Sequence, residues 1–298
     1  MENLRGAAFM VLAMFSFALL DTTIKILSQS MSVGQALALI SIGILALLLG
    51  WSVVQGIPLW QAEYRNSRVI LRSLCEVVGT CLISQALSLV PLTTVSAVIQ
   101  ATPLVVAMGA GLFLGQAIGW RRWIAIIVGF GGVLLIIRPG LEGFNPATLL
   151  AVAGMLALAS RDLLTRALHV TLSGVQLGIH AFAFVLPASL VLMIAPGEPL
   201  VQPDAGTWAL VLAGVFIGVM SYLSIIAATR FGNAGVISSF RYSRMIFALA
   251  IGFVVLGERP DAATLVGAAI IITSGIFTLW REARMRRDHG EKWELLSS

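Results

Sequence analysis

Ten apolar segments, each about as long as a membrane-spanning helix, run through this chain of 298 residues. A helix needs about 20 mostly apolar residues to cross the hydrocarbon core of a bilayer. We expect helices over 4–27, 33–54, 69–89, 93–115, 121–138, 147–168, 172–194, 207–229, 234–256 and 262–281. Short connections rich in glycine and proline separate them, and no soluble domain fits between them. The sequence therefore predicts an all-α membrane protein with ten transmembrane helices.

The composition supports this prediction. Hydrophobic residues make up 58% of the chain and charged residues only 11%, whereas soluble proteins carry about 25% charged residues. The excess apolar surface needs membrane lipid as its solvent. The net charge of +5 comes from bases scattered over connections and the C-terminal tail rather than from one patch. We therefore expect no nucleic-acid partner.

The distribution of lysine and arginine predicts the orientation of the chain. If the N-terminus lies in the cytoplasm, most bases fall on the cytoplasmic side, and only Lys25, Arg138 and Arg259 fall outside. Bacterial membrane proteins keep such an excess of positive charge inside. Both termini are therefore expected to be cytoplasmic.

A repeated spacing of charges indicates that the chain is one half-sequence used twice. Asp21 and Asp162 lie 141 positions apart, and so do Lys25 and Arg166. We place the first repeat at 1–143, the second at 144–284 and a basic cytoplasmic tail at 285–298. Because each half holds five helices, an odd number, the second half must insert upside-down relative to the first. The sequence thus predicts two inverted five-helix repeats with a central site between them.

Asp21 with Lys25, and Asp162 with Arg166, are each one helical turn apart. At this spacing each pair can neutralise itself, which lowers the cost of charge in a membrane. The inversion places the two pairs near opposite membrane faces. Two interpretations stay open: ion pairs that anchor or gate the helices, and a relay for protons or solute.

Arg72 and Glu76 form a further pair at the same spacing in the third helix. Glu76 lies deeper in the membrane and is a candidate for coupling transport to protons. A purely structural pair is the alternative.

The ninth helix carries cations with no acid within one turn, in the segment SSFRYSRMIFAL. Arg241 and Arg244 share a helix face, so they need acids from other helices or a polar ligand. We list them as candidate solute-binding residues with Arg72, Tyr242, Gln100 and Tyr222. Polar residues at this depth are also common in plain contacts between helices.

The chain shows no sequence motif of a hydrolase, ATPase or redox enzyme, and its histidines have no metal-binding spacing. The two cysteines, Cys75 and Cys81, are expected to be ordinary packing residues. We therefore predict that the protein is not an enzyme and binds no cofactor or metal.

Several stretches resemble the EamA-type branch of the drug/metabolite transporter superfamily. They are ALSLVPLTTVSAVIQATPLVVAMGAGLFLG, GWRRWIAIIVGFGGVLLIIRPG and RYSRMIFALAIGFVVLGERP. DTTIK, GWRRW and FRYSR are similar to bacterial S-adenosylmethionine uptake carriers. Gln116 stands where the family often has Glu, whereas Glu258 keeps it. The resemblance implies a carrier of the bacterial inner membrane with a central cavity.

The leading hypothesis is a secondary active transporter that moves a small polar metabolite by alternating access. The alternative within this class is an uptake carrier for a vitamin or nucleoside-like compound, such as riboflavin or S-adenosylmethionine, rather than an exporter. A membrane enzyme would need a catalytic constellation, and a scaffold would not need buried arginines. Proton coupling, and a monomer or a homodimer, remain open.

Overall fold

The computed structural model describes residues 2–116, 118–141, 144–168, 171–194, 199–231 and 234–297, with the side chains of 229, 234–236, 282–283 and 285–297 left aside. Every regular element in these ranges is helical. In chain order the elements are α1 (Glu2–Leu27), α2 (Val33–Val54), η1 (Ala62–Arg65), α3 (Ser67–Leu89), α4 (Leu92–Ile99), α5 (Thr102–Phe113), α6 (Trp120–Ile137), α7 (Thr148–Ala167), α8 (Gly174–Ile194), α9 (Ala205–Arg230), α10 (Ala234–Ser239), η2 (Phe240–Tyr242), α11 (Ser243–Val254) and α12 (Ala262–Ser297).

These elements form ten helical segments that are long and apolar enough to cross a membrane. Each coincides with one of the segments expected from the sequence, so the prediction of an all-α protein with ten spans is confirmed. The structure departs from the prediction in two of them. The fourth span is divided into α4 and α5, and the ninth into α10, η2 and α11.

The break in the fourth span has a direct cause in the sequence. Pro103 has no backbone N–H and therefore cannot donate to the carbonyl of Ile99. The hydroxyl of Thr102 donates to that carbonyl instead, at 2.6 Å. In the ninth span a single 3₁₀ turn, Phe240–Tyr242, interrupts the helix without a proline.

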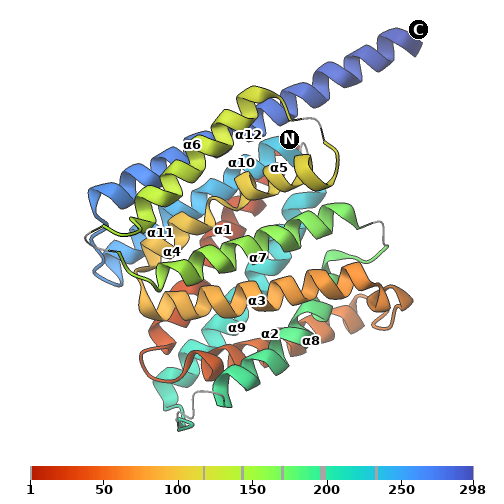
Figure 1. Ribbon diagram of the computed structural model, residues 1–298. Helices are drawn as coiled ribbons and strands as arrows, with labels where there is room; N and C mark the ends of the chain where they lie inside the picture. The colour runs from red at the N-terminus through yellow and green to blue at the C-terminus, as the bar shows by residue number, and fades with distance from the viewer. Residues whose placement is uncertain are drawn as a thin grey trace.

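The helices pair across the two halves of the chain. The most extensive contacts join α1 to α9, α3 to α7, α2 to α8 and α6 to α12, and Figure 1 shows α6 lying beside α12. If each span of the first half is replaced by its counterpart in the second half, and the reverse, the same four pairs result. Two matched repeats require this symmetry. The inversion of one repeat in the membrane stays a prediction from the odd number of spans.

Glycine lets the paired backbones approach closely. A Cβ on Gly34 of α2 would lie 2.2 Å from the backbone nitrogen of Met193 in α8, and one on Gly132 of α6 would lie 2.7 Å from the carbonyl oxygen of Gly267 in α12. Lipid does not drive helices together by the hydrophobic effect, so close packing of small residues contributes much of their association.

The last helix extends past the bundle. Figure 1 shows the C-terminal part of α12 projecting away from the other helices. The backbone of 285–297, expected as a free tail, continues this helix. Its side chains lie outside the described part of the structure, so the basic character of the tail stays a feature of the sequence alone.

Candidate functional site

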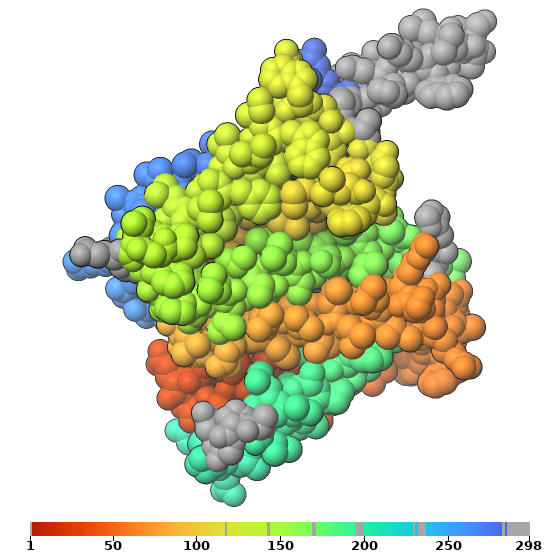
Figure 2. Space-filling model, in the orientation of Figure 1, coloured from red at the N-terminus to blue at the C-terminus, as the bar shows by residue number. Residues whose placement is uncertain are grey.

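A cavity of about 220 Å³ lies at the centre of the bundle. Its lining comes from both halves of the chain, including α1, α3, α7, α9 and both broken spans. A second cavity of about 310 Å³ shares six of these residues: Pro103, Arg161, Asp162, Tyr222, Ile225 and Arg241. On the face seen in Figure 2, the side chains of α3 and α7 form a continuous wall. The cavities therefore lie inside the bundle rather than on this surface.

Most of the residues predicted for the site line these cavities. Seven line the central cavity: Asp21, Glu76, Gln100, Asp162, Tyr222, Arg241 and Arg244. Arg72 and Arg166 line the second cavity. The lining of neither cavity includes Lys25 or Tyr242.

The two helix breaks meet at the central cavity. Gln100 lies at the break in the fourth span and Arg241 in the turn that breaks the ninth. The side-chain amide of Gln100 donates to the carbonyl of Arg241 at 3.4 Å. These two residues are 141 positions apart, the offset that relates Asp21 to Asp162. The repeat therefore places matching breaks face to face at the core.

Asp21 pairs with a residue from the other half of the chain. Its carboxylate lies 2.5 Å from the guanidinium of Arg244. The side chains are 8% and 13% exposed, so the pair is largely buried. The expected pair between Asp21 and Lys25 is therefore wrong: Asp21 turns toward the cavity, where a cation of α11 needs an acid.

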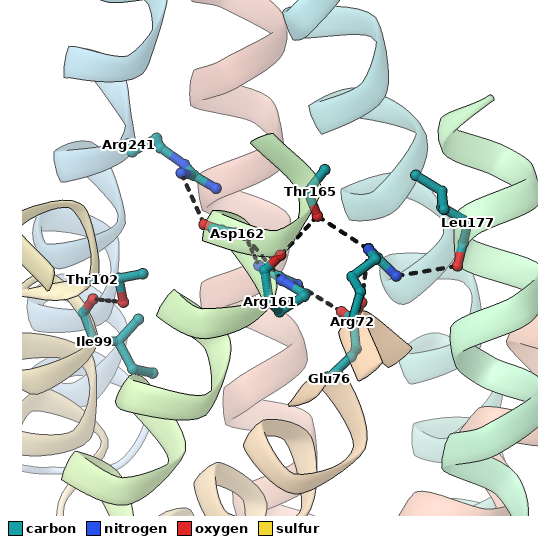
Figure 3. Close-up of polar contacts among 9 residues, drawn as sticks. All are labelled: Arg72, Glu76, Ile99, Thr102, Arg161, Asp162, Thr165, Leu177 and Arg241. Atoms are coloured by element: carbon teal, nitrogen blue, oxygen red, sulfur yellow. Dashed lines mark hydrogen bonds and ion pairs between the residues drawn. The ribbon is translucent and has the colours of Figure 1, made fainter. Parts of the chain in front are cut away.

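Five charged residues form a chain of ion pairs that runs from α3 through α7 to the turn at Arg241 (Figure 3). Arg72 and Glu76 lie 3.0 Å apart, which confirms their predicted pairing. Glu76 also lies 2.6 Å from Arg161, and Arg161 lies 2.7 Å from Asp162. Asp162 ends the chain at Arg241, at a distance of 3.4 Å. Alternating acids and bases allow these charges to remain inside a bilayer.

Arg72 has two further acceptors that fix its position. Its guanidinium donates to the hydroxyl of Thr165 at 3.2 Å and to the backbone carbonyl of Leu177 at 3.3 Å. The side chain is only 6% exposed. Arg72 thus ties α3 to α7 and α8, and it contributes more to holding the wall than to the central cavity.

Lys25 lies at the end of the bundle beyond the cavity, where it holds three helices together. Its ammonium group donates to the carbonyls of Leu87 and Val90 at 2.8 and 2.7 Å and lies 3.9 Å from Glu258. We call this region, formed by the ends of α1, α3 and α11 and the start of α4, the Glu258 end. It lies on the left in Figure 1.

Glu258 completes this closure by capping α4. Its carboxylate accepts from the backbone N–H groups of Leu92 and Thr93 at 2.6 and 3.0 Å and from the Thr93 hydroxyl at 3.0 Å. A carboxylate at a helix start satisfies free N–H groups and opposes the positive end of the helix dipole. Lys25 and Glu258 are 16% and 10% exposed, so this end of the cavity is shut.

The opposite end of the bundle gives access to the cavities. We call it the Gln116 end, formed by the starts of α1 and α6 and the ends of α5 and α7. The second cavity extends toward this end, and two of its lining residues, Thr165 and Arg166, are exposed. The central cavity therefore communicates with the surface at the Gln116 end.

The two predicted tyrosines occupy different places. Tyr222 lines both cavities, and its ring meets Phe182 edge-on at 6.0 Å between centroids. A Cβ on Gly178 would lie 2.4 Å from this ring, so a glycine is needed to make room for it. Tyr242 is 4% exposed and packs against Gly275 of α12. It belongs to the helix interface behind the cavity.

Two features of the site were missed by reasoning from the sequence. Arg161 was not among the predicted site residues, yet its long side chain reaches both Asp162 and Glu76. Glu258 was noted as a family residue without a partner, and its contacts with Lys25 and α4 come from another half of the chain. The constant offset of 141 could have linked Gln100 to Arg241, but it gives no signal for the contacts of Arg161 or Glu258.

The acids and histidines of the described residues include no group of three or more that could hold a metal ion. The chemistry of the cavity is that of guanidinium groups, carboxylates, an amide and a phenol on apolar walls. Such groups can hold a solute by charge and hydrogen bonds.

Comparison with known proteins gives a consistent result. The profile of the EamA-like transporter family matches residues 4–138 and again 145–280. A riboflavin transporter of Vibrio cholerae is 26% identical over 96% of both chains. An S-adenosylmethionine uptake transporter of Rickettsia conorii is 26% identical over 74% of both chains. A pseudopaline exporter of Pseudomonas aeruginosa is 26% identical over 91% of this chain and 94% of its own length. A solved crystal structure aligns with a TM-score of 0.64 at 17% identity, over 95% of this chain and 98% of the other, which shows a shared fold.

Proposed function

Because this chain belongs to the EamA-like transporter family, within the drug/metabolite transporter superfamily, we propose that it is a secondary carrier of the bacterial inner membrane. The carrier moves a small polar metabolite by alternating access. Membership of this family makes the chain a multi-pass membrane transporter and not an enzyme. Solute, direction and energy source are the parts we propose.

The meeting of the two broken spans at the central cavity carries this proposal. Helices interrupted at corresponding positions of two repeats mark the solute site in many secondary transporters. Here the breaks at Gln100 and Arg241 are matched in sequence and in contact. Helices that only pack have no need of such breaks, because each costs backbone hydrogen bonds in the membrane.

The unequal closure of the two ends supports alternating access. The Glu258 end is shut by Lys25 and by the cap on α4, whereas the Gln116 end reaches exposed residues. Two matched repeats can exchange these roles, which would open the Glu258 end and shut the other. The arrangement seen is then one of two states, with the cavity open to the cytoplasm if the termini are cytoplasmic.

Within the cavity the residues have separate roles in this proposal. Arg241, Arg244, Gln100 and Tyr222 contact the solute, since all four line the central cavity. Tyr242 is left out, because it lies behind the cavity. Lys25 and Arg166 act at the two ends as gating residues.

Proton coupling is assigned to the acids that link the two sides of the cavity. Asp21 and Asp162 each pair with an arginine of the ninth span, and Glu76 joins Arg72 to Arg161. Protonation of such a carboxylate would free its arginine for the solute. An imposed pH gradient across proteoliposomes should then drive accumulation of the solute, and transport indifferent to the gradient would contradict this role.

Uptake of a vitamin or nucleoside-like compound is the second candidate. The observation that favours it is the similarity to proteins named riboflavin transporter and S-adenosylmethionine uptake transporter. Similarity to a protein named as an exporter favours the opposite direction of transport, export from the cell.

The test is solute exchange by purified protein in proteoliposomes. A thermal-shift screen over amino acids, nucleosides, flavins and S-adenosylmethionine selects solutes that stabilise the folded protein. We expect at least one of them to accumulate by counterflow in proteoliposomes. The paired change Asp21→Asn with Arg244→Gln removes both charges together and should abolish exchange while the protein stays folded. Full exchange in this variant, or no exchange of any stabilising solute, would overturn the proposal.

A further inference from the structure

The lining of the two cavities has more cations than anions. Among the described residues it contains four arginines that are not exposed, Arg72, Arg161, Arg241 and Arg244, and three acids, Asp21, Glu76 and Asp162. A surplus of positive charge in a membrane interior is costly unless water or an anion compensates it. The cavity is therefore suited to a solute that brings negative charge.

Of the three arginines that line the central cavity, Arg241 has the greatest unused binding capacity. Its side chain is 31% exposed, compared with 20% for Arg161 and 13% for Arg244. Its distance to Asp162 is 3.4 Å, whereas the other pairs of the cavity lie at 2.5 to 3.0 Å. Asp162 is also shared with Arg161, which binds it more closely. A guanidinium has five N–H donors, so Arg241 retains donors for a ligand.

The position of Arg241 is that of a contact made on entry. It lies in the 3₁₀ turn that breaks the ninth span and lines both cavities. A solute that passes from the Gln116 end to the centre must therefore go by this guanidinium. The backbone of Arg241 is held by the amide of Gln100, so the turn is supported from the other repeat.

The rest of the central cavity is largely apolar. Its walls include Phe17, Ile40, Ile83, Leu158 and Phe182. Such walls suit a hydrophobic or aromatic body, while polar groups fix its orientation. The ligand that fits both parts is an amphipathic molecule with one anionic group.

We infer that Arg241 is the binding point for a carboxylate of the transported solute, so that the carrier selects amphipathic organic anions. This inference rests on the proposed function. A planar carboxylate can accept two parallel N–H bonds from a guanidinium, which is the strongest arrangement of this kind. When the carboxylate of the solute replaces Asp162 as the partner of Arg241, Asp162 is still neutralised by Arg161.

The test is a series of ligands of nearly equal shape but different charge. We would measure binding of 3-phenylpropionate, 3-phenylpropanamide and 3-phenylpropylamine to the purified full-length protein at pH 7 by calorimetry. We expect the carboxylate to bind at least about tenfold more tightly than the amide or the amine, as a charge-assisted hydrogen bond implies.

Variants of Arg241 show whether this residue sets the preference. Arg241→Gln should bring the carboxylate and the amide to within about twofold of each other, and Arg241→Lys should retain part of the difference. Arg121→Gln removes an exposed arginine outside the central cavity and should leave the full preference. Thermal unfolding should show that Arg241→Gln stays folded, because Asp162 keeps its contact with Arg161.

Equal or tighter binding of the amide or amine would overturn the inference, as would an unchanged preference in Arg241→Gln. Failure of all three ligands to bind at 10 mM would also overturn it. Counterflow in proteoliposomes separates this result from the proposed function. A protein that exchanges only neutral or cationic solutes is still a carrier, but not one that selects anions.

Discussion

The two ends of the bundle share a backbone turn and differ in the side chain that it presents. Gly115 and Gly257 both have φ of 65°. The next N–H group turns back to a carbonyl six residues earlier in each case, from Gln116 to Ala110 at 3.2 Å and from Glu258 to Gly252 at 2.8 Å. Glu258 is nearly buried against α4, whereas Gln116 is exposed. The two turns thus have the same backbone geometry, and a charged side chain at one of them is the first difference between the closed end and the open one.

The neighbourhood of these turns differs in the same direction. Gly252 has no Cβ, and one placed there would lie 2.8 Å from Thr93 and 3.1 Å from the Glu258 carboxylate. The matching residue at the Gln116 end is Ala110. The Glu258 end also has an ion pair between Arg138 and Asp261. Three differences of sequence therefore favour closure at one end.

Of the substitutions that test this comparison, removal of the Glu258 carboxylate should have the largest effect on stability. Glu258→Ala takes away the acceptor for two N–H groups of α4 and the acid beside Lys25. We expect a loss of about 2–4 kcal/mol of stability, as for a lost cap together with a charged hydrogen-bond partner. Thermal unfolding in detergent measures it.

Gln116→Ala is the matched control at the other end. It is an exposed residue, so we expect a change within about 0.5 kcal/mol. Equal effects of the two substitutions would show that the two ends are closed alike.

The next largest loss of stability is expected where α11 approaches α4 closely. Gly252→Ala inserts a methyl group against Thr93 and Glu258 and should destabilise the protein by about 1–3 kcal/mol through overpacking. Gly131→Ala in α6 is the control, because a Cβ there meets no atom within 4 Å. This control should be neutral or slightly stabilising. A loss in both variants alike would point to a general intolerance of alanine in these helices.

Transfer of the acid to the other end should shift the balance between the two states. Gln116→Glu gives the Gln116 end the side chain that closes its counterpart. We expect the labelling rate of a cysteine introduced at Ser238, which lines the second cavity, to fall roughly fivefold, as a coupling of about 1 kcal/mol implies. Gln116→Asn should leave that rate unchanged, and an equal fall in both variants would exclude charge as the cause.

The smallest effect concerns Asp261, which precedes α12. The N–H of Thr264 donates to its carboxylate at 2.8 Å, and Arg138 contacts it as well. These contacts, that of Thr264 first, hold the pKa of Asp261 below its usual value of 3.8. Because the pKa is lower in the folded protein, the stabilisation is present above pH 3.8 and is lost as the pH falls through the lower folded value.

Asp261→Asn should therefore flatten the fall in melting temperature on the acid side of pH 4. The difference from the unmodified protein is expected to be small, because the side chain is 54% exposed and solvent screens the ion pair. A steeper fall in the variant would contradict the assigned cause.

Local pattern was sufficient to predict the ten spans, because each depends on residues that are close together in the sequence. The division into two inverted repeats stays a prediction from the fixed offset and the odd number of spans in each half. Like the spans, the pair of Arg72 and Glu76 was predictable from residues close together in the sequence. Asp21 and Lys25 have the same spacing, yet their partners are Arg244 and Glu258.

The reason lies in the direction of the two side chains and in the cost of buried charge. In a medium of low dielectric constant, a charge gains most from the opposite charge that lies closest to it, and the Lys25 side chain points away from Asp21 to Glu258. Such a partner comes from a helix more than 200 residues away, and its position depends on how the repeats pack. A single sequence does not specify that packing residue by residue.

Labelling of two cysteines tests most directly whether the cavity opens at one end at a time. With Cys75 and Cys81 replaced by serine, Ser84→Cys lines the central cavity toward the Glu258 end, and Ser238→Cys lines the second cavity. A membrane-impermeant maleimide applied from the Gln116 side should react with Ser238→Cys, and the same reagent applied from the Glu258 side should spare Ser84→Cys. Adding Glu258→Gln should raise labelling of Ser84→Cys and lower that of Ser238→Cys. Equal labelling of the two positions, unchanged by Glu258→Gln, would contradict alternating access controlled by this residue.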